Sequence, residues 1–334
     1  MKLKVAVVYG GRSGEHEVSV RSARSVMDAL DPAKYEQIEY FIDKTGKWSP
    51  APIVPEPGAH PGIDVVFPVL HGTFGEDGTI QGLLELADLP YVGAGVLASS
   101  VAMDKEMTKR VCAARMLPVV DYVVLARGQA GAVDACRALG FPVFVKPANL
   151  GSSVGISKAR NASELEASIE LAARYDRKVI VERAIDGREL ECSVLGNEDP
   201  IASLPCEILP SREFYDYEDK YLLDMARTIL PAELPAGMTA EVRRLAVESY
   251  RAVECEGMAR VDFLLESSTG TVYLNEINTI PGFTSISMYP KLWEASGIPY
   301  PRLLDRLIEL AIERHAEKRR RKTAFQPKSD WYTK

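Results

Sequence analysis

Short apolar runs alternate with segments of helical period in the first part of the chain. Apolar runs of strand length occupy residues 5–9, 35–42 and 65–70, and amphipathic helical sequence occupies residues 17–30 and 79–87. The first run, Val5 to Tyr9, is apolar throughout, which is typical of a strand buried on both faces of a parallel sheet. The alternation therefore predicts a doubly wound α/β layer over residues 1–97.

The alternation continues in two further units. The second, residues 98–186, is predicted to contain helices at 104–114, 130–139 and 163–173 and strands at 122–125, 141–146 and 178–182. The third, residues 187–315, opens with a strand at 189–195 and contains helices at 239–255 and 300–319. Residues 206–230 follow no regular pattern, and loops of this length are usually functional lids or disordered segments. The expected class is α/β (α+β), with a basic tail at 316–334.

Two β-prone runs near the C-terminal third, residues 262–266 and 271–275, predict a hairpin. Gly270 suits the left-handed position that ends a three-residue loop, so Ser267 is expected to pair with Thr271. Counting back along both strands then sets Asp262 opposite Glu276.

Period-two alternation places Arg260, Asp262, Glu276 and Asn278 on one face of this hairpin. Three oxygen ligands held in this way suit Mg²⁺ carried by a polyphosphate, because Mg²⁺ takes few protein carboxylates and completes its octahedron with water and phosphate. The alternative is a solvated polar face on an edge hairpin. A register slip of one residue would break the arrangement.

Composition narrows the classes of protein. The formal net charge of −7 gives no basic surface for general nucleic-acid binding. Five scattered cysteines, without C-x-x-C spacing, indicate reduced thiols in the cytoplasm rather than a zinc site or a disulfide framework. The N-terminal apolar run is too short for a signal peptide, and no segment approaches the length of a membrane span. We therefore expect a cytoplasmic protein without nucleic-acid or membrane partners.

A second polar motif follows the strand that ends at Lys146. The loop after it is rich in glycine and serine, and includes Ser152 and Ser153. Glycines allow backbone N–H groups to approach a phosphate closely, and the hydroxyl groups add donors. The motif is not a Walker A loop, because no G-K-[ST] closes it. A glycine-rich turn with an exposed lysine is the alternative.

Single polar residues near strand ends are weaker candidates. Glu182 ends an apolar strand and could contact a base or a ribose, although such residues are most often surface groups. Glu15 lies just past the first strand, where α/β sheets bind ligands, and could hold an ammonium group; it could equally be a helix-start acid. His71 follows the third strand at the same edge, where a structural role is the alternative.

Two segments in the third unit complete the candidate chemistry. The turn that contains Gly282 follows the polar hairpin; its backbone N–H groups could bind an oxyanion, and Ser287 could donate to a carboxylate. Tyr215, Tyr217 and Tyr221 lie in the irregular stretch and suggest a lid over a polar site, or else a loop held by aromatic packing.

Taken together and in order, these motifs resemble the ATP-grasp ligases and, among them, the D-alanine–D-alanine ligases. The resemblance runs from Val5 to about Leu310 and rests on residues 10–19, 71–78, 146–155, 215–221, 260–262 and 275–287. It implies an ATP-grasp fold, with ATP held between the second and third units. It also implies ligation of two D-alanines to D-alanyl-D-alanine through an acyl phosphate, for peptidoglycan precursor synthesis.

The resemblance assigns roles to individual residues. The ATP-binding set would be Lys105, Lys146, Ser152, Ser153, Glu182, Ala184, Ile185, Glu189, Lys220, Asn275 and Glu276. Two Mg²⁺ or Mn²⁺ ions would be bound by Asp262, Glu276 and Asn278, with Glu276 bridging. The catalytic and substrate-binding set would be Glu15, His71, Ser152, Tyr221, Arg260, Gly282 and Ser287. Because relatives are commonly dimers, the resemblance also implies a homodimer.

Tyr221 bears on the second substrate. Relatives that make D-alanyl-D-lactate carry a histidine in this role, so Tyr221 favours the dipeptide-forming type, and D-serine stays open as second substrate. Two alternatives remain: another ATP-grasp carboxylate–amine ligase, and a nucleotide-binding regulatory protein without turnover. The complete catalytic set argues against the latter.

Overall fold

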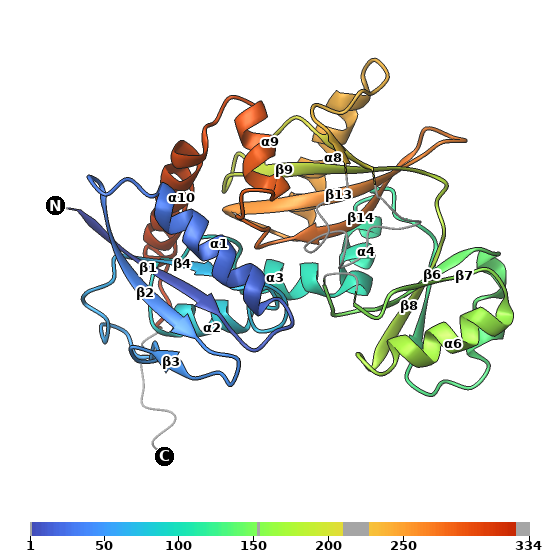
Figure 1. Ribbon diagram of the computed structural model, residues 1–334, viewed down its shortest axis with the longest axis horizontal. Helices are drawn as coiled ribbons and strands as arrows, with labels where there is room; N and C mark the ends of the chain where they lie inside the picture. Colours follow the sequence, from blue (N-terminus) through green and yellow to red (C-terminus); the bar gives the residue numbers. More distant parts are fainter. Residues whose placement is uncertain (1, 152–153, 210–226, 325–334) are drawn as a thin grey trace, which may run out of the picture.

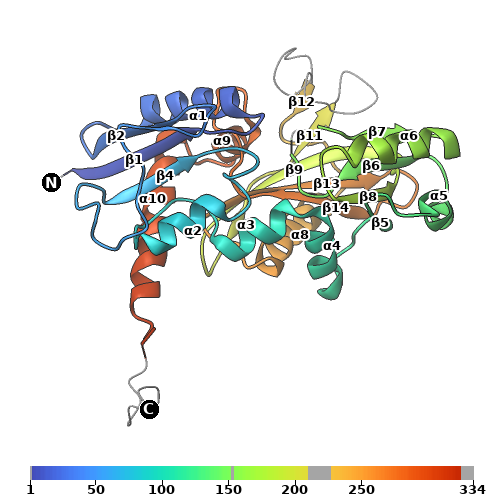
Figure 2. The same ribbon diagram turned by 90° about the horizontal axis from the view of Figure 1, so that it is seen from below.

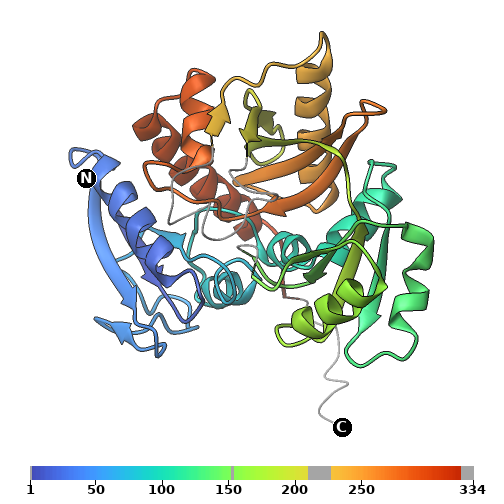
Figure 3. The same ribbon diagram turned by 45° about the vertical axis from the view of Figure 1, so that its right-hand side comes forward.

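The computed structural model describes residues 2–151, 154–209 and 227–324. Its strands form three sheets, two of four strands and one of six. The N-terminal sheet and the sheet of the second unit lie at opposite ends of the molecule, and the six-stranded sheet lies between them (Figure 1). A view turned by 45° shows the same order, with the blue and green units on either side of the orange one (Figure 3).

The N-terminal sheet has the order β3-β2-β1-β4. Its strands are β1 (Leu3–Gly10), β2 (Tyr35–Ile42), β3 (Trp48–Ser49) and β4 (Val65–Val69). β1 pairs in parallel with β2 and β4, and only the short edge strand β3 is antiparallel. Helices α1 (His16–Ala29) and α10 (Tyr300–Arg319) share a core with one face, and α2 (Thr79–Leu86) shares a core with the other. The predicted doubly wound layer is confirmed.

The second unit has an antiparallel sheet of order β5-β8-β6-β7. Its strands are β5 (Tyr122–Ala126), β6 (Val143–Pro147), β7 (Ser157–Ala159) and β8 (Lys178–Arg183), and α6 (Ala162–Ala172) lies against β6 and β7 (Figure 2). The predicted continuous helix over 130–139 is wrong. Left-handed Gly131 and Gly140 bound this segment, which contains only the short helix α5 (Ala132–Ala135) and a 3₁₀ turn at Arg137–Leu139.

The six-stranded sheet has the order β12-β11-β9-β13-β14, with β10 beside β9. Its strands are β9 (Gly187–Leu195), β10 (Ile201–Ala202), β11 (Cys206–Leu209), β12 (Arg227–Ile229), β13 (Met258–Glu266) and β14 (Val272–Asn278). Helix α8 (Met238–Ala252) packs on β9, β13 and β14, and α9 (Met288–Ala295) packs on β9. Helices α3 (Val96–Met103) and α4 (Lys105–Ala114) connect the N-terminal sheet to the rest, and α3 was not predicted.

The prediction that residues 206–230 are irregular is wrong at both ends of this stretch, where the structure has strands. Glu207 pairs with Ile229 and Leu209 with Arg227, so β11 and β12 form an antiparallel ladder. Because both strands are short, neither shows a clear period in the sequence. Residues 210–226, which include Tyr215, Tyr217, Lys220 and Tyr221, lie outside the described part of the chain.

For the hairpin of β13 and β14, the predicted loop is wrong, whereas the predicted pairing of Asp262 with Glu276 is correct. The N–H of Glu266 donates to Thr271 O at 2.9 Å, so the loop is 267–270 and the predicted pairing of Ser267 with Thr271 is wrong by one residue. A β-bulge at Asn275 adds one residue to the other strand, and Asp262 therefore lies opposite Glu276 as predicted.

The C-terminal helix α10 is part of the core under the N-terminal sheet. Leu303, Leu304, Leu307 and Ile308 are fully buried and share a core with Val5 and Phe67 of that sheet. The helix runs past the sheet and away from the body of the molecule (Figure 2).

Replacing one of these leucines is expected to weaken the fold. Leu307→Ala removes a fully buried side chain from this shared core, so it should lower the free energy of unfolding by about 2–5 kcal/mol. The control is Leu86→Ala in α2, where the leucine is 64% exposed and the change should stay within about 0.5 kcal/mol. Urea unfolding followed by circular dichroism measures both. Equal midpoints for the two variants would contradict the packing of α10.

Candidate active site

Glu182, at the end of β8, lies between two lysines. Its Oε2 accepts a hydrogen bond from Lys146 Nζ at 2.7 Å, and Lys109 Nζ lies 3.1 Å from its Oε1. Burial by itself raises the pKa of Glu182, but the two ammonium groups outweigh this effect and lower the pKa to about 2. Glu182 is therefore a buried, charged acceptor held in place from two sides.

Sequence reasoning missed Lys109, although a signal was present. It follows Lys105 by four residues in a predicted helix, and residues at that spacing share a face. Its side chain is 0% exposed, so burial lowers its pKa while Glu182 opposes that effect. Lys146 is also buried, and there the attraction of Glu182 outweighs burial and raises the pKa. Its burial rules out the alternative of a glycine-rich turn with an exposed lysine.

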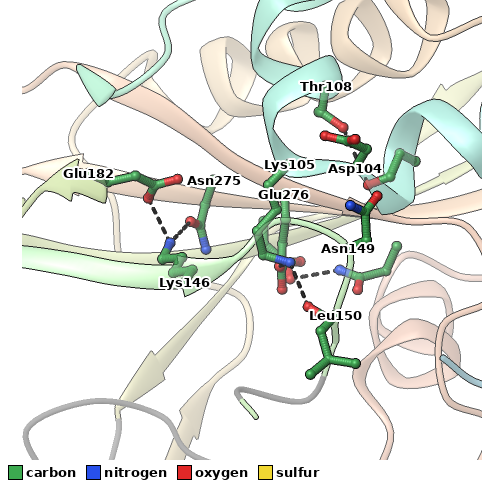
Figure 4. A network of polar contacts seen from close by, with 12 residues as sticks. Asp104, Lys105, Thr108, Lys146, Asn149, Leu150, Glu182, Asn275 and Glu276 are labelled. Atoms are coloured by element: carbon green, nitrogen blue, oxygen red, sulfur yellow. Dashed lines mark hydrogen bonds and ion pairs between the residues drawn. The ribbon is translucent and has the colours of Figure 1, made fainter. Parts of the chain in front are cut away.

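The bulge in β14 brings two consecutive side chains to the lysines of the second unit. Asn275 Oδ1 lies 3.3 Å from Lys146 Nζ, and Glu276 Oε2 lies 3.4 Å from Lys105 Nζ. Figure 4 shows Asn275 and Glu276 side by side, each beside its lysine. In a regular strand these neighbours would point to opposite faces, so the extra residue is what directs both toward the second unit.

The glycine-rich loop begins beside Lys105. The ammonium group of Lys105 donates to Leu150 O at 2.9 Å, and its backbone N–H donates to Ala148 O at 2.9 Å (Figure 4). The side chain of Asp104 caps the start of α4 by accepting from the N–H groups of Glu106 and Met107. Lys105 is thus held at the entrance of the loop. Ser152 and Ser153 lie outside the described residues.

The polar face of the hairpin is as predicted. Arg260 donates from Nε and one terminal nitrogen to the two oxygens of Asp262, both at 2.7 Å, and Asn278 Nδ2 donates to Asp262 Oδ2 at 2.9 Å. Asp262 is only 2% exposed, so the alternative of a solvated edge face is wrong for this residue. Burial lowers the pKa of Arg260, but Asp262 and Glu191 outweigh it and raise the pKa well above its ordinary value.

Glu191 in β9 is a second acid that sequence reasoning missed. It is paired with Asp262 across β9 and β13, is 2% exposed, and its Oε2 lies 3.3 Å from Arg260 Nε. The period-two spacing of Glu189, Glu191 and Ser193 would have placed it on the same face as Glu189. Arg260 is therefore held by carboxylates from its own strand and from the next one.

The donor set of the hairpin fits a magnesium ion that arrives with a phosphate. Within the described residues, no three His, Cys, Asp or Glu side chains form a group that could hold a metal alone. Asp262 and Glu276 face each other across the ladder, and Asn278 adds an amide. Two carboxylates and an amide oxygen leave most of an octahedron to phosphate and water, as Mg²⁺ prefers.

Glu15 and His71 meet at the carboxyl edge of the N-terminal sheet. Glu15 is the N-cap residue of α1, and its carboxylate lies so close to Gly72 that a Cβ there would be 2.4 Å from Oε2. The same oxygen would lie 3.6 Å from a Cβ at Gly151, in the glycine-rich loop of the second unit. Gly72 also takes a left-handed φ of 70°, which favours glycine. The first and second units therefore meet at Glu15.

The turn with Gly282 connects β14 to helix α9. Ser287 is the N-cap residue of α9, and its Oγ accepts from Thr284 N–H at 2.9 Å. A Cβ at Gly282 would lie 2.6 Å from Ser287 Oγ, so only glycine fits there without a shift. The positive end of the helix dipole suits an anion.

The remaining predicted residues lie around the lysine cluster. Ala184 and Ile185 follow Arg183, the last residue of β8, and Glu189 lies in β9. The N–H of Ala184 donates to Pro142 O at 3.1 Å. The five cysteines are buried and free, as expected for reduced thiols. Among the described residues, no helix is long and apolar enough to cross a membrane.

Comparison with known proteins agrees with this geometry. The family described as "D-ala D-ala ligase C-terminus" matches residues 111–309, and "D-ala D-ala ligase N-terminus" matches 4–61 and 54–94. A D-alanine–D-alanine ligase of Solibacter usitatus is 76% identical over 318 residues, which cover 95% of this chain and 98% of that protein.

Solved structures agree as well. The D-alanine-D-alanine ligase from Coxiella burnetii superposes with a TM-score of 0.87 at 42% identity and covers 96% of both chains. VanG D-Ala:D-Ser ligase from Enterococcus faecalis gives a TM-score of 0.86 at 36% identity and covers 93% of this chain and all of that one.

The fold is that of the ATP-grasp ligases, as the sequence predicted. The chain belongs to the D-alanine–D-alanine ligase family. It is accordingly an ATP-dependent ligase, so the alternative of a regulatory protein without turnover falls away.

The buried lysine pair yields a prediction about stability. Lys109→Met removes one of the two cations that hold Glu182, and it should lower the free energy of unfolding by about 3 kcal/mol at pH 7. Arg110→Met is the control, because Arg110 follows Lys109 in the same helix and its side chain is 63% exposed. Urea unfolding of both variants measures the difference, and equal losses would contradict a structural role for the buried pair.

The same variant should also respond to acid. The pKa of Glu182 is below its ordinary value of 4.5 in the folded protein, so its stabilising contribution is complete above pH 4.5 and is lost as the pH falls toward 2. Without Lys109 the pKa of Glu182 lies closer to its ordinary value, so the acid-side loss of stability should still begin near pH 4.5 but end at a higher pH and be smaller than in the unmodified protein. Urea unfolding as a function of pH measures this, and an equally large loss in both proteins would contradict it.

Proposed function

We propose that ATP binds between the second and third units and that the two D-alanines bind between the third unit and Glu15. The observation that carries this is the position of the hairpin. Its Glu276 faces Lys105 of the second unit, while the turn that follows it contacts the N-terminal unit at His71. One strand and its following turn thus link a candidate phosphate site to a candidate substrate site.

The nucleotide is proposed to use the lysine cluster. Lys105 and Lys146 contact the phosphates, helped by N–H and hydroxyl groups of the loop with Ser152 and Ser153. Glu182 accepts from the adenine amino group, and this role is supported by its fixed, ionised carboxylate. The other proposed nucleotide contacts are Ala184, Ile185, Glu189, Lys220, Asn275 and Glu276.

Two Mg²⁺ or Mn²⁺ ions are proposed to be bound by Asp262, Glu276 and Asn278, with Glu276 shared. When bound, such ions neutralise the charge that develops on the transferring phosphoryl group. The support for this is the donor set, in which Asp262 and Glu276 face each other across the ladder.

The reaction is proposed to run in two steps. A carboxylate oxygen of the first D-alanine attacks the γ-phosphorus of ATP, and ADP leaves with the bridging oxygen. The amine of the second D-alanine then attacks the acyl phosphate carbon, a proton is lost from nitrogen, and the carbon–oxygen bond to phosphate breaks. Arg260 and the Gly282 N–H stabilise the oxyanion of the tetrahedral intermediate.

The substrates are proposed to be held by side chains of the N-terminal and third units. Glu15 orients the first amino group, together with hydroxyl groups of Ser152 and Tyr221, and His71 acts at the same place through its contact with the turn that follows β14. Ser287 holds the second carboxylate, supported by its position at the start of α9. His71 lies within hydrogen-bonding distance of the turn that carries Gly282.

We further propose the domain division at 1–97, 98–186 and 187–315, a homodimer and a cytoplasmic location. The buried free thiols support the last of these.

Glu276→Gln is expected to abolish phosphoryl transfer. The amide keeps the size of the side chain but cannot share a negative charge between cations, so D-alanine-dependent phosphate release should fall on the order of 10³-fold. Glu294→Gln in α9 is the control, because that glutamate is exposed and lies in a different element from Glu276. Near-normal turnover of Glu276→Gln would refute the bridging role.

The identity of the second substrate needs its own test, since one structural relative is a D-Ala:D-Ser ligase. Purified enzyme with ATP, Mg²⁺ and D-alanine is offered D-serine or D-lactate at equal concentration. Mass spectrometry should show D-alanyl-D-alanine as the main product, because Tyr221 is retained. A main product with D-lactate, or with D-serine, would overturn this specificity.

A further inference from the structure

The turn with Gly282 is held from outside its own unit. Three side chains of the N-terminal unit contact its backbone: Ser22 from α1, and His71 and Glu76 from the loop after β4. Two of them, Ser22 and Glu76, have no role in the proposed reaction. Together the three side chains contact the backbone before Gly282, at Ile280, and directly after it, at Phe283.

The contacts of Ser22 and His71 form a directed chain. His71 Nδ1 lies 3.0 Å from Ile280 O, which can only accept, so Nδ1 carries the hydrogen. Burial lowers the pKa of His71, so its Nε2 is an acceptor and takes the hydroxyl hydrogen of Ser22 at 3.1 Å. The oxygen of Ser22 then accepts from Phe283 N–H at 3.2 Å.

Glu76 completes the set from the other side. Burial and the charge of Glu15 raise the pKa of Glu76 to about 8. One oxygen of its carboxyl group accepts from Gly72 N–H at 2.6 Å, and the other lies 3.4 Å from Ile280 N. Ile280 therefore has its carbonyl bound to His71 and its N–H facing Glu76. The same glycine, Gly72, lies against the carboxylate of Glu15, so the loop that positions the turn also borders the proposed site of the first amino group.

We propose that Ser22 and Glu76 are positioning residues that, with His71, fix the direction of the Gly282 N–H toward the reacting carbonyl. This inference rests on the proposed function, in which that N–H helps to stabilise the tetrahedral oxyanion. A donor contributes only when its direction is set in advance, and a displacement of less than an ångström weakens it. The N-terminal unit thereby controls the second step of the reaction without touching the carbonyl.

The competing explanation is that packing alone sets the turn. Phe283 is fully buried and has ring contacts with Phe67 at 5.7 Å and Tyr289 at 5.7 Å. In that case the polar contacts would only satisfy buried groups, and their loss would affect stability but not the balance of the two steps.

The two steps can be measured separately. Positional isotope exchange in ATP labelled with ¹⁸O at the β,γ-bridge reports reversible acyl-phosphate formation, and mass spectrometry reports dipeptide. In Ser22→Ala and Glu76→Gln, dipeptide formation should fall about 10-fold or more while acyl-phosphate formation persists, so the ratio of exchange to dipeptide should rise about 10-fold. The KM for ATP should stay unchanged.

Ser19→Ala is the matched control. Ser19 is a fully buried serine of the same helix whose hydroxyl contacts Gly10 and Val69 instead of the turn, so its loss should lower stability and leave the ratio unchanged. A ratio that is unchanged in Ser22→Ala and Glu76→Gln overturns the inference. If the unmodified enzyme forms no dipeptide, the proposed function itself fails, and the two failures are thus distinguished.

Discussion

The bidentate ion pair between Arg260 and Asp262 is the interaction on which the site depends. A buried carboxylate without a counter-charge would be protonated or would unfold its strand, because burying an isolated charge is very costly. Here Arg260 neutralises Asp262 and approaches Glu191, so a charged face can exist inside a six-stranded sheet. The same ion pair holds together the residues of the proposed metal-binding and oxyanion sites.

Most of the fold could be predicted from periodicity, since long runs such as residues 35–42 and 300–319 coincide with β2 and α10. The hairpin shows where this reasoning fails. A prediction from period-two alternation assumes that each residue of one strand lies opposite a single residue of the other. Neither the shift at the loop nor the bulge at Asn275 has a signature in the sequence. The shift at the loop and the bulge displace the pairing by one residue in opposite directions. The predicted pairing of Asp262 with Glu276 is therefore correct, although the counting that predicts it omits both.

The site residues divide in the same way. Lys109 and Glu191 could have been found, because helical and strand spacing link them to residues already singled out. Ser22 and Glu76 could not, since the groups of the turn that they contact are backbone atoms more than two hundred residues away in the chain. The roles of Ser152, Ser153, Lys220 and Tyr221 come from resemblance alone and stay predictions.

Helix α10 has a consequence for how the protein is made. One face of the N-terminal sheet shares its core with helix α10, which is synthesised long after β1 and after the two other units. On the ribosome α1 covers only part of this face until residues 300–319 have emerged, and exposed apolar surface favours aggregation. The core of the N-terminal unit is thus completed only after synthesis of the units that follow it, and a fragment ending before residue 300 would leave the part of that apolar face that α10 covers exposed.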